Sequence, residues 1–401
     1  MSEVSFLRSR PRRAEQITIV AASLAGGGTE RFAADLSRAL QESGRQVTLI
    51  TWSGNDPDDY ALPVEVNRER VEIREVSASR LDTVRLFLRS STALRQKIIS
   101  TRPDVVVSLG DLTNVRTIGC LVGTRIPKIA AERTDPMHHR LSKRWRTARD
   151  WAYPLADAVL VQTPEIAQWF NANTRVKRLA VIPNAVRDVR DLQSRFQSGA
   201  FVSNREPIVM GMGRLSREKG FDLLLAAFAK SHLSQDGWQL LILGEGPERE
   251  ALSGMAAAFG IANALNMPGR VNDIEKWLDR ASVFVLPSRY EGFPNALLEA
   301  MQVGLACVSF DSSSAARRIL VDHRNGLLVA GNDVEGLSAA LRNLAVDPQL
   351  RAQLGAEASR VGEQFSRERI YGEWLRVLDA AASGQLEAYL HARREQVEPS
   401  G

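Results

Sequence analysis

The chain has 401 residues, enough for two domains with full hydrophobic cores. Its 44% hydrophobic and 25% charged residues are typical of a folded globular protein and exclude a disordered or fibrous chain. The two cysteines, Cys120 and Cys307, exclude a disulfide framework, and no apolar run approaches the roughly 20 residues that span a bilayer. Residues 1–15 are rich in arginine with no apolar segment after them, so we expect a disordered basic lead-in rather than a secretory signal.

The net charge of +5 is unevenly distributed. Residues 1–200 contain 31 Lys and Arg against 22 Asp and Glu, a net +9, whereas the remainder contains 21 against 25, a net −4. A basic first half indicates that this half meets an anionic partner. Nucleic acid, an anionic membrane surface and a phosphorylated lipid all satisfy this condition.

The first half alternates strand and helix patterns. Apolar and β-branched runs predict strands at residues 17–22, 47–51, 71–76, 105–109, 128–131 and 158–162. Helical periodicity predicts helices at residues 30–42 and 81–100. Strands separated by helices indicate a parallel sheet covered on both faces, here an N-terminal Rossmann-like domain over residues 16–187.

The pattern restarts after a polar linker at residues 188–207. Strands are expected at residues 208–213, 240–243, 283–287, 306–310 and 327–329, with helices at 221–230 and 249–259 and from Asn295, Ala315 and Val334. These elements predict a second Rossmann-like domain over residues 208–366. Helices in residues 367–395 could complete either domain, and we expect them on the N-terminal one. The predicted fold class is α/β, with two doubly wound domains facing each other across a cleft.

The stretch SRYEGFPNALLEAMQ at residues 288–302 places two carboxylates at the end of a predicted buried strand. The helix after this strand starts near Asn295, a residue type favoured at helix N-termini. Free backbone N–H groups there form a pocket with partial positive charge. Glu291 and Glu299 could hold two hydroxyl-bearing parts of one ligand, such as a sugar and a ribose. The alternative is a solvated Glu291 and an ordinary Glu299 on the helix surface.

Glycine-rich turns follow the first strand of each predicted domain. The turn Gly26-Gly27-Gly28-Thr29-Glu30-Arg31 opens the first helix, where glycine lets the backbone approach a phosphate or sugar. It lacks the G-x-G-x-x-G pattern of dinucleotide binding. In the second domain Arg214 and Lys219 flank a turn, where two cations could clamp a pyrophosphate. A plain tight turn and two exposed basic residues are the alternatives.

Taken in order, these motifs resemble family 4 glycosyltransferases, which are retaining enzymes of the two-Rossmann-domain GT-B architecture. The matching segments are Gly27-Gly28-x-Glu30-Arg31, Ile182-Pro183-Asn184, Gly213-Arg214 with Lys219-Gly220, Gly244-x-Gly246, Pro268-Gly269, and Ser288 with Glu291-Gly292-Phe293-Pro294 and Glu299-Ala300-Met301. The likeness runs from about residue 17 to residue 375. The glycine motif and Glu132-Arg133-Thr134-Asp135-Pro136 are most similar to bacterial transferases that extend lipid-linked oligosaccharide, capsule or lipopolysaccharide glycans.

The resemblance implies roles for these residues. Arg214 and Lys219 would bind the donor diphosphate, Glu299 would hold the ribose hydroxyls, and Glu291 would face the transferred sugar. The rest of the implied donor site consists of Gly27, Gly28, Gly244, Arg270, Val271, Gly292, Phe293, Pro294 and Asn295. The departing phosphate would take the acceptor's proton, and the charges of Arg214 and Lys219 would stabilise it as it leaves, without a metal ion.

The sequence departs from the family pattern in two places. Many relatives have a histidine in the loop after the fifth strand, where this chain has Glu132-Arg133-Thr134-Asp135, with His138 and His139 displaced. We expect Arg133 and Asp135, together with Arg31, on the acceptor side, in roles that stay unassigned. Relatives also often have Gly-Pro-x-Glu where this chain has Ala315-Ala316-Arg317-Arg318, so the contacts of that loop stay unassigned too.

The segment at residues 138–153 combines basic and aromatic residues. On a helix, its apolar residues share one face, which is typical of a helix on a membrane surface. An ordinary helix with this face in the domain core is the alternative, and both hold if the arginines meet lipid phosphates. The candidate membrane residues are Arg140, Lys143, Arg144, Trp145, Arg146 and Arg149.

The resulting hypothesis is a cytoplasmic, monomeric glycosyltransferase, peripheral at the inner face of the cell membrane. It would move a hexose or N-acetylhexosamine from a nucleotide sugar, with a UDP-sugar favoured, to a lipid-linked or glycan acceptor, without a cofactor or metal. One alternative is a nucleotide-sugar 2-epimerase on the same fold. Another is a non-catalytic binder of anionic lipid or nucleic acid. The paired glutamates argue against this binder, so we expect no nucleic-acid partner.

Overall fold

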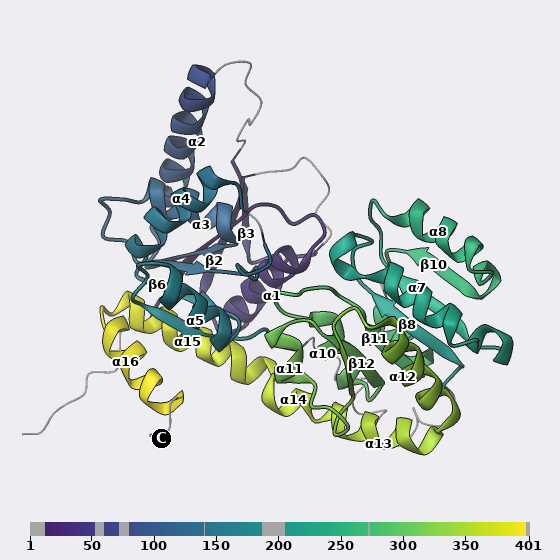
Figure 1. The fold of residues 1–401 in the computed structure, drawn as a ribbon. Helices are drawn as coiled ribbons and strands as arrows, with labels where there is room; N and C mark the ends of the chain where they lie inside the picture. The colour runs from purple at the N-terminus through teal and green to yellow at the C-terminus, as the bar shows by residue number, and fades with distance from the viewer. Residues whose placement is uncertain are drawn as a thin grey trace, which may run out of the picture. The chain divides into compact units, whose positions relative to one another are not determined.

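The computed structural model describes residues 13–52, 60–71, 80–139, 141–186, 205–271 and 273–397, with the side chains of these residues except 80–88 and 394–397. The chain forms two compact units, each with its own sheet (Figure 1). Unit 1 consists of Met1–Pro183 and Ile370–Gly401, and unit 2 of Asn184–Arg369. The chain therefore leaves unit 1, builds all of unit 2, and then returns.

The sheet of unit 1 contains seven parallel strands in the order β3-β2-β1-β4-β5-β6-β7. The strands are β1 (Gln16–Ala21), β2 (Gln46–Thr51), β3 (Asn67–Arg70), β4 (Val105–Leu109), β5 (Lys128–Ala131), β6 (Ala158–Val161) and β7 (Leu179–Val181). All five residues of β4 are buried, as expected for a central strand covered on both faces. The strand order reverses between β1 and β4, so the carboxyl ends of these strands form the topological switch point of unit 1.

Helices connect the strands of unit 1. They are α1 (Gly28–Glu42), α2 (Arg80–Ser100), α3 (Asp111–Cys120), α4 (Lys143–Ala152) and α5 (Pro164–Asn173). The start of α5 follows from its sequence, because the Thr163 side chain accepts a hydrogen bond from the Ile166 N–H and proline occupies the first helical position.

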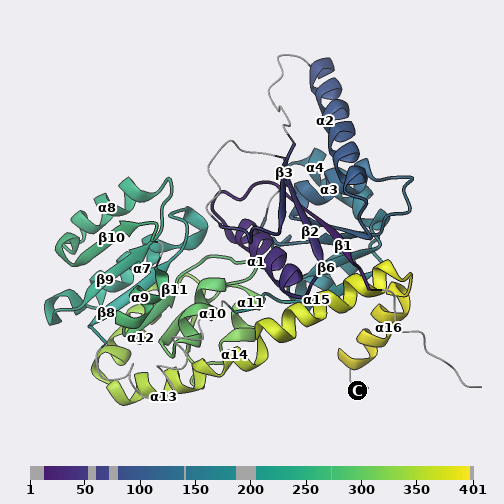
Figure 2. The same ribbon diagram turned by 180° about the vertical axis from the view of Figure 1, so that it is seen from behind.

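The last two helices, α15 (Arg367–Ala382) and α16 (Leu386–Val397), complete unit 1 (Figure 2). Trp374 is fully buried, and its ring centroid lies 5.5 Å from that of Phe32 in α1. The Arg45 guanidinium donates two hydrogen bonds of 2.9 Å to Asp379. Through these contacts α15, near the C-terminus, completes a core to which residues near the N-terminus also belong.

The sheet of unit 2 contains six parallel strands in the order β10-β9-β8-β11-β12-β13. The strands are β8 (Ile208–Met212), β9 (Gln239–Leu243), β10 (Leu265–Gly269), β11 (Val283–Leu286), β12 (Ala306–Asp311) and β13 (Leu327–Ala330). The order reverses between β8 and β11, which pair directly through Val209 and Val283. The switch point of unit 2 therefore lies where β8 and β11 end.

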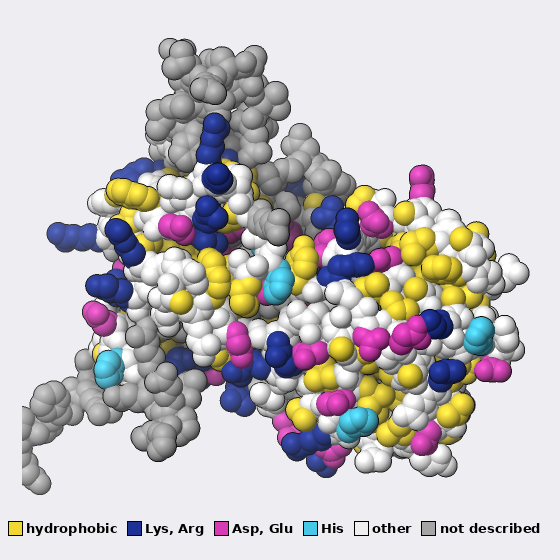
Figure 3. All heavy atoms as spheres, in the orientation of Figure 1, with side chains coloured by type: hydrophobic (Ala, Val, Ile, Leu, Met, Phe, Trp, Pro, Cys, Tyr) yellow, Lys and Arg dark blue, Asp and Glu magenta, His cyan; other side chains and the backbone are white. Residues whose placement is uncertain are grey.

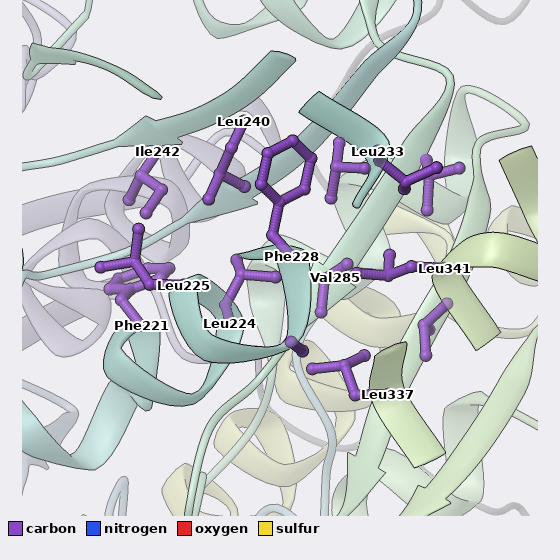
Figure 4. Packing of buried hydrophobic residues seen from close by; sticks show 14 of the residues in the cluster. Phe221, Leu224, Leu225, Phe228, Leu233, Leu240, Ile242, Val285, Leu337 and Leu341 are labelled. Carbon is purple, nitrogen blue, oxygen red and sulfur yellow. The ribbon is translucent and has the colours of Figure 1, made fainter. Parts of the chain in front are cut away.

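Helix α7 fixes the segment that follows β8. The helices of unit 2 are α7 (Phe221–Lys230), α8 (Arg249–Ala258), α9 (Ile274–Arg280), α10 (Asn295–Gln302), α11 (Ser314–Ile319), α12 (Val334–Val346), α13 (Pro348–Ser359) and α14 (Val361–Gln364). Phe221, Leu224, Leu225 and Phe228 of α7 are spaced for one helical face and lie in a buried cluster with Val285 of β11 (Figure 4). The first residue of α7, Phe221, is already packed in this cluster. The turn that connects β8 to α7 is therefore held in place where it enters the helix.

The predicted elements and the observed ones agree closely in the central strands and the long helices, and less well at the sheet edges. At residues 71–76 a strand is predicted, but Val71 is not in a strand and residues 72–76 lie outside the described residues. The observed edge strand is β3, whose polar sequence NRER gives no strand signal because an edge strand is partly exposed. The short strands β7 and β10 are also missed. Most of the predicted lead-in and linker lies outside the described residues.

Candidate active site

The switch point of unit 2 brings together the two loops that carry the predicted donor-binding residues. The loop after β8 contains Lys219, and the loop after β11 contains Ser288 and Glu291. Lys219 Nζ lies 2.7 Å from Glu291 Oε1, and Ser288 Oγ donates a 2.7 Å hydrogen bond to the same oxygen. Two of the three predicted catalytic side chains are therefore in direct contact.

This ion pair is partly buried, since the side chains of Lys219 and Glu291 are 26% and 9% exposed. An anion that binds Lys219 must therefore share or displace the Glu291 carboxylate. Arg214, the third predicted catalytic residue, is exposed. Burial alone would raise the pKa of Glu218, but hydrogen bonds from Ser216 and the backbone, with the charges of Lys219 and Arg214, lower it. The charges of Lys219 and Arg214 therefore both favour the ionised form of Glu218 in this loop.

Two glycines allow the strand ends of the site to approach closely. A Cβ atom on Gly220 would lie 2.0 Å from the carbonyl oxygen of Pro287, and one on Gly244 would lie 1.9 Å from that of Gly213. Their φ angles, +66° and +139°, are also unfavourable for other residues. The backbone after β8 is therefore in direct contact with the ends of both neighbouring strands.

The rest of the predicted donor site lines the start of α10 and the end of β10. Glu299 lies in the second turn of α10 and is 1% exposed, so it is not an ordinary surface residue. The ring of Phe293 packs against that of Phe365, with 6.0 Å between the ring centroids, and this contact anchors the loop. Asn295 is the first residue of α10 rather than its cap, which is Pro294, and its Oδ1 accepts a 2.7 Å hydrogen bond from Asn184. Gly292 is half-buried, as is Val271, whereas Arg270 is exposed.

In unit 1, the glycine-rich turn leads from β1 into α1. Gly27 has a φ of +145°, and a Cβ atom there would lie 2.4 Å from Glu30 Oε2. The Glu30 side chain therefore folds back over the turn, and burial raises the pKa of this carboxyl group. Tyr60 donates a 3.2 Å hydrogen bond to the Gly27 carbonyl. Gly28 begins α1, and Arg31 lies 3.7 Å from Asp35.

The loop after β5 is held by the buried carboxylate of Glu132. Its Oε1 accepts hydrogen bonds from the Arg133 N–H and from the N–H and hydroxyl of Thr134, at 2.6–3.0 Å. Its Oε2 accepts a 2.7 Å hydrogen bond from the Tyr153 hydroxyl, which in turn accepts one from Asn114. Burial raises the pKa of Glu132, and the charge of Asp111 raises it further. This network fixes the conformation of the loop.

The same loop pairs both displaced histidines with aspartates. His138 Nδ1 lies 2.8 Å from Asp135 Oδ2, and His139 Nε2 lies 3.2 Å from Asp111 Oδ2. Asp111 is the first residue of α3 and is separated from the end of β4 by Gly110 alone. The hydrogen bond to Asp111 raises the pKa of His139. Asp135 is 4% exposed, whereas both histidine side chains are 44% exposed, so the imidazoles rather than Asp135 face the solvent.

Arg133 is a buried residue in this structure. Its guanidinium lies 3.6 Å from the ring centroid of Phe32, and the residue is only 9% exposed. Burial lowers the pKa of Arg133 to about 9. The residue thus packs against α1, the helix that starts at the glycine-rich turn.

The predicted membrane helix is α4, and its two faces differ as expected for an amphipathic helix. Trp145, Ala148 and Ala152 pack in a buried cluster of unit 1, whereas Lys143, Arg144 and Arg146 are exposed. Lys and Arg side chains are spread over the visible face of unit 1 (Figure 3).

One of the candidate membrane residues, Arg149, is placed differently from this. Arg149 is 5% exposed and lies 5.0 Å from the Trp169 ring centroid, so its assignment as a lipid-contacting residue is wrong. Arg149 follows Trp145 by four residues and therefore shares its inner face. Arg140 lies outside the described residues.

No helix within the described parts of the chain is long and apolar enough to cross a membrane. Among the described residues there is also no group of three or more His, Cys, Asp or Glu side chains placed to hold a metal ion.

Two family models match the chain, one for each sheet. The description "Glycosyltransferase Family 4" matches residues 26–190, and "Glycosyl transferases group 1" matches residues 194–361. Two doubly wound parallel sheets with these two matches define a glycosyltransferase of GT-B architecture. The chain belongs to glycosyltransferase family 4.

Two relatives named as glycosyltransferases support this assignment, and one solved structure shares the fold. One is the α-1,4-N-acetyl-D-galactosaminyltransferase of Campylobacter jejuni that is named for GalNAc-α-(1→4)-GalNAc-α-(1→3)-diNAcBac-PP-undecaprenol, 26% identical over 90% of this chain and 98% of the relative. The lipopolysaccharide core biosynthesis glycosyltransferase LpsE of Rhizobium meliloti is 28% identical over 88% of this chain and 96% of the relative. Among solved structures, HepE of Anabaena in complex with UDP and glucose has a TM-score of 0.73 at 18% identity, covering 91% of this chain and 99% of that chain.

Sequence reasoning missed several residues that shape these sites. Asp111 and Tyr153 come from separate elements, and only the fold brings them to the loop after β5. Arg289 lies inside the stretch at residues 288–302 that carries Glu291 and Glu299, but its partners are about 70 residues away in sequence. For Asp111 and Arg289 the one available signal was their position just after predicted strands, where parallel sheets gather functional residues; Tyr153 had no such signal.

Proposed function

We propose that this glycosyltransferase moves a hexose or N-acetylhexosamine, with retention of configuration, from a nucleotide sugar to a lipid-linked or glycan acceptor. The observation that carries the proposal is the contact of Lys219, Glu291 and Ser288 at the switch point of unit 2. This is where open parallel sheets bind nucleotide ligands. A UDP-sugar is the favoured donor, and the solved HepE complex with UDP and glucose is in keeping with that choice.

In this proposal the donor diphosphate lies against Lys219 and Arg214. The bond between the anomeric carbon and the phosphate oxygen breaks, and the acceptor oxygen bonds to the same face of that carbon. The acceptor's proton passes to the departing phosphate. Lys219 and Arg214 stabilise the negative charge that develops on this leaving group, and Glu291 stabilises the positive charge that develops on the sugar. The two cations supply the charge that a divalent metal supplies in other enzymes, so we propose that transfer is metal-independent.

We further propose that the acceptor is presented at the inner face of the cell membrane. Names such as PP-undecaprenol and lipopolysaccharide core among the relatives support a lipid-linked acceptor. On α4, Lys143, Arg144 and Arg146 are exposed cations, and Trp151 near the end of the same helix is 77% exposed. Cations with an interfacial aromatic ring suit an anionic lipid surface. Binding of this kind would be peripheral and weakened by salt.

A donor screen followed by product analysis tests the proposed function. UDP-, GDP- and ADP-sugars are compared for the thermal stabilisation that differential binding to the folded protein produces. The stabilising donor is then incubated with short-chain polyprenyl-diphosphate oligosaccharides, and the anomeric configuration of the product is read by NMR. An α-linked product from an α-linked donor supports the proposal. Release of a free 2-epimerised sugar would instead identify an epimerase, and no binding of any sugar nucleotide would overturn the proposal.

A further inference from the structure

Arg289 connects the two loops of the donor site in unit 2. It belongs to the loop after β11, two residues before Glu291. Its guanidinium forms a two-pronged pair with Asp222, with Nη1 to Oδ1 at 2.7 Å and Nη2 to Oδ2 at 2.6 Å. Nη1 also donates a 2.7 Å hydrogen bond to the carbonyl of Arg217, and the Arg289 backbone N–H donates one of 2.8 Å to the carbonyl of Glu218. All four hydrogen bonds reach the segment at residues 217–222.

These contacts surround the residue that carries the ammonium group. Lys219 lies between Glu218 and Asp222, and its own side chain returns to Glu291. Gly220 leaves no space for a Cβ atom beside the carbonyl of Pro287, so the two loops touch along their backbones. The Lys219 turn is therefore held to the Glu291 loop on one side by its own ion pair and on the other side by Arg289.

The Arg289–Asp222 pair is well suited to fix geometry. A guanidinium that meets a carboxylate through two parallel hydrogen bonds defines direction as well as distance, which a single ammonium cannot do. The side chains are only 26% and 35% exposed. Burial alone would raise the pKa of Asp222, but the hydrogen bonds and charge of Arg289 lower it, so the carboxylate stays ionised at neutral pH. Asp222 is also in the first turn of α7, the helix anchored in the core.

We propose that Arg289 is a positioning residue for sugar transfer, which holds the Lys219 turn in register with Glu291 by clamping Asp222 and the backbone at residues 217–218. This rests on the proposed function, because it deepens the role of the same site. Arg289 acts through Lys219 and Glu291. Misplacement of a catalytic group by about 1 Å can slow a reaction about a hundredfold.

The test compares Arg289→Met with a matched control, Arg280→Met. Arg280 forms the same kind of two-pronged pair with Glu206 in unit 2, at 2.6 and 2.9 Å, and within the described part of the chain its side chain forms no hydrogen bond or ion pair with the 217–222 segment. The dissociation constants of UDP and GDP, kcat and KM are measured for both variants. We expect Arg289→Met to weaken nucleotide binding about tenfold and to lower kcat/KM about a hundredfold. Arg280→Met should leave these values within about twofold, and Arg289→Lys should lie between Arg289→Met and the wild type.

A readout that does not depend on activity separates this inference from the proposed function. Hydrogen exchange of the backbone amides at residues 215–222 should accelerate in Arg289→Met and not in Arg280→Met. If the wild type binds no sugar nucleotide, the proposed function fails, and the exchange data still decide whether Arg289 holds the turn. If the wild type transfers sugar and both variants match it in binding, kcat/KM and exchange, then Arg289 stabilises the fold only, and the inference is overturned.

Discussion

Replacing Glu291 by glutamine should separate catalysis from nucleotide binding. The substitution keeps the shape and the hydrogen bond from Ser288 but removes the charge that lies 2.7 Å from Lys219. If the carboxylate stabilises positive charge on the reacting sugar, kcat should fall about a hundredfold to a thousandfold, equivalent to ~3–4 kcal/mol. Lys219 would lose a competitor for the donor phosphate, so the dissociation constant of UDP should stay the same or become smaller. A hydrogen bond to a charged group is worth about 1.5–3 kcal/mol, which sets the upper limit on lost stability.

The matched variant is Glu299→Gln, eight residues further along the chain. Its proposed partner is the ribose of the nucleotide, so UDP should bind roughly tenfold to a hundredfold more weakly, following the same 1.5–3 kcal/mol. The loss should appear mainly in KM. Isothermal titration with UDP and steady-state kinetics are measured for both variants, with urea unfolding as the control for folding. Equal effects of the two substitutions on kcat and on UDP affinity would refute the assigned roles.

Three further predictions follow from other parts of the structure. Activity should persist in a chelator, and a complete loss that Mg²⁺ or Mn²⁺ restores would contradict metal independence. Replacing Lys143, Arg144 and Arg146 by alanine should abolish salt-sensitive binding to anionic liposomes, since each cation is worth ~1 kcal/mol there; binding that survives high salt would rule this out. The pKa of His139 is raised mainly by Asp111, against burial, with Glu132 raising it slightly and Arg149 opposing. His139→Gln should therefore destabilise the protein in urea below about pH 6.5, by at most ~1 kcal/mol, and this deficit should shrink as the pH rises through the folded pKa. A loss of unfolding free energy that instead grows as the pH rises would contradict the stabilising pair between His139 and Asp111.

The fold class could be predicted from the sequence because strands and helices are indicated by patterns of apolar residues within short segments of the chain. Val283–Leu286 is a continuous apolar run, and Val105–Leu109 is interrupted only by Ser108; both are followed by turns, and such patterns identify parallel strands without reference to their neighbours. The edge strand β3 could not be found in this way, because its residues are polar and its pairing with β2 is purely a backbone property.

The sites were only partly predictable for a related reason. Glu291 and Lys219 could be named from their motifs, but their direct contact depends on how two loops 72 residues apart are folded. Arg149 was misassigned because the helical face was judged from apolar residues alone, whereas its guanidinium lies over the ring of Trp169 in a cation–π contact. Arg133 shows the same limit, since nothing in the sequence indicates that it packs over Phe32.

The return of the chain from unit 2 to unit 1 has a consequence for biosynthesis. Phe32 and Arg45 are made early, but their partners Trp374 and Asp379 leave the ribosome only after all of unit 2 has been translated. Domains made in one piece can fold as they emerge, at about 5–20 residues per second. Unit 1 instead has to wait tens of seconds with an apolar surface of α1 uncovered, while unit 2 can complete its own core first. The nascent chain is therefore expected to need protection from aggregation in its N-terminal part. This exposure ends only when the segment from Ile370 onward has been made and packs onto unit 1.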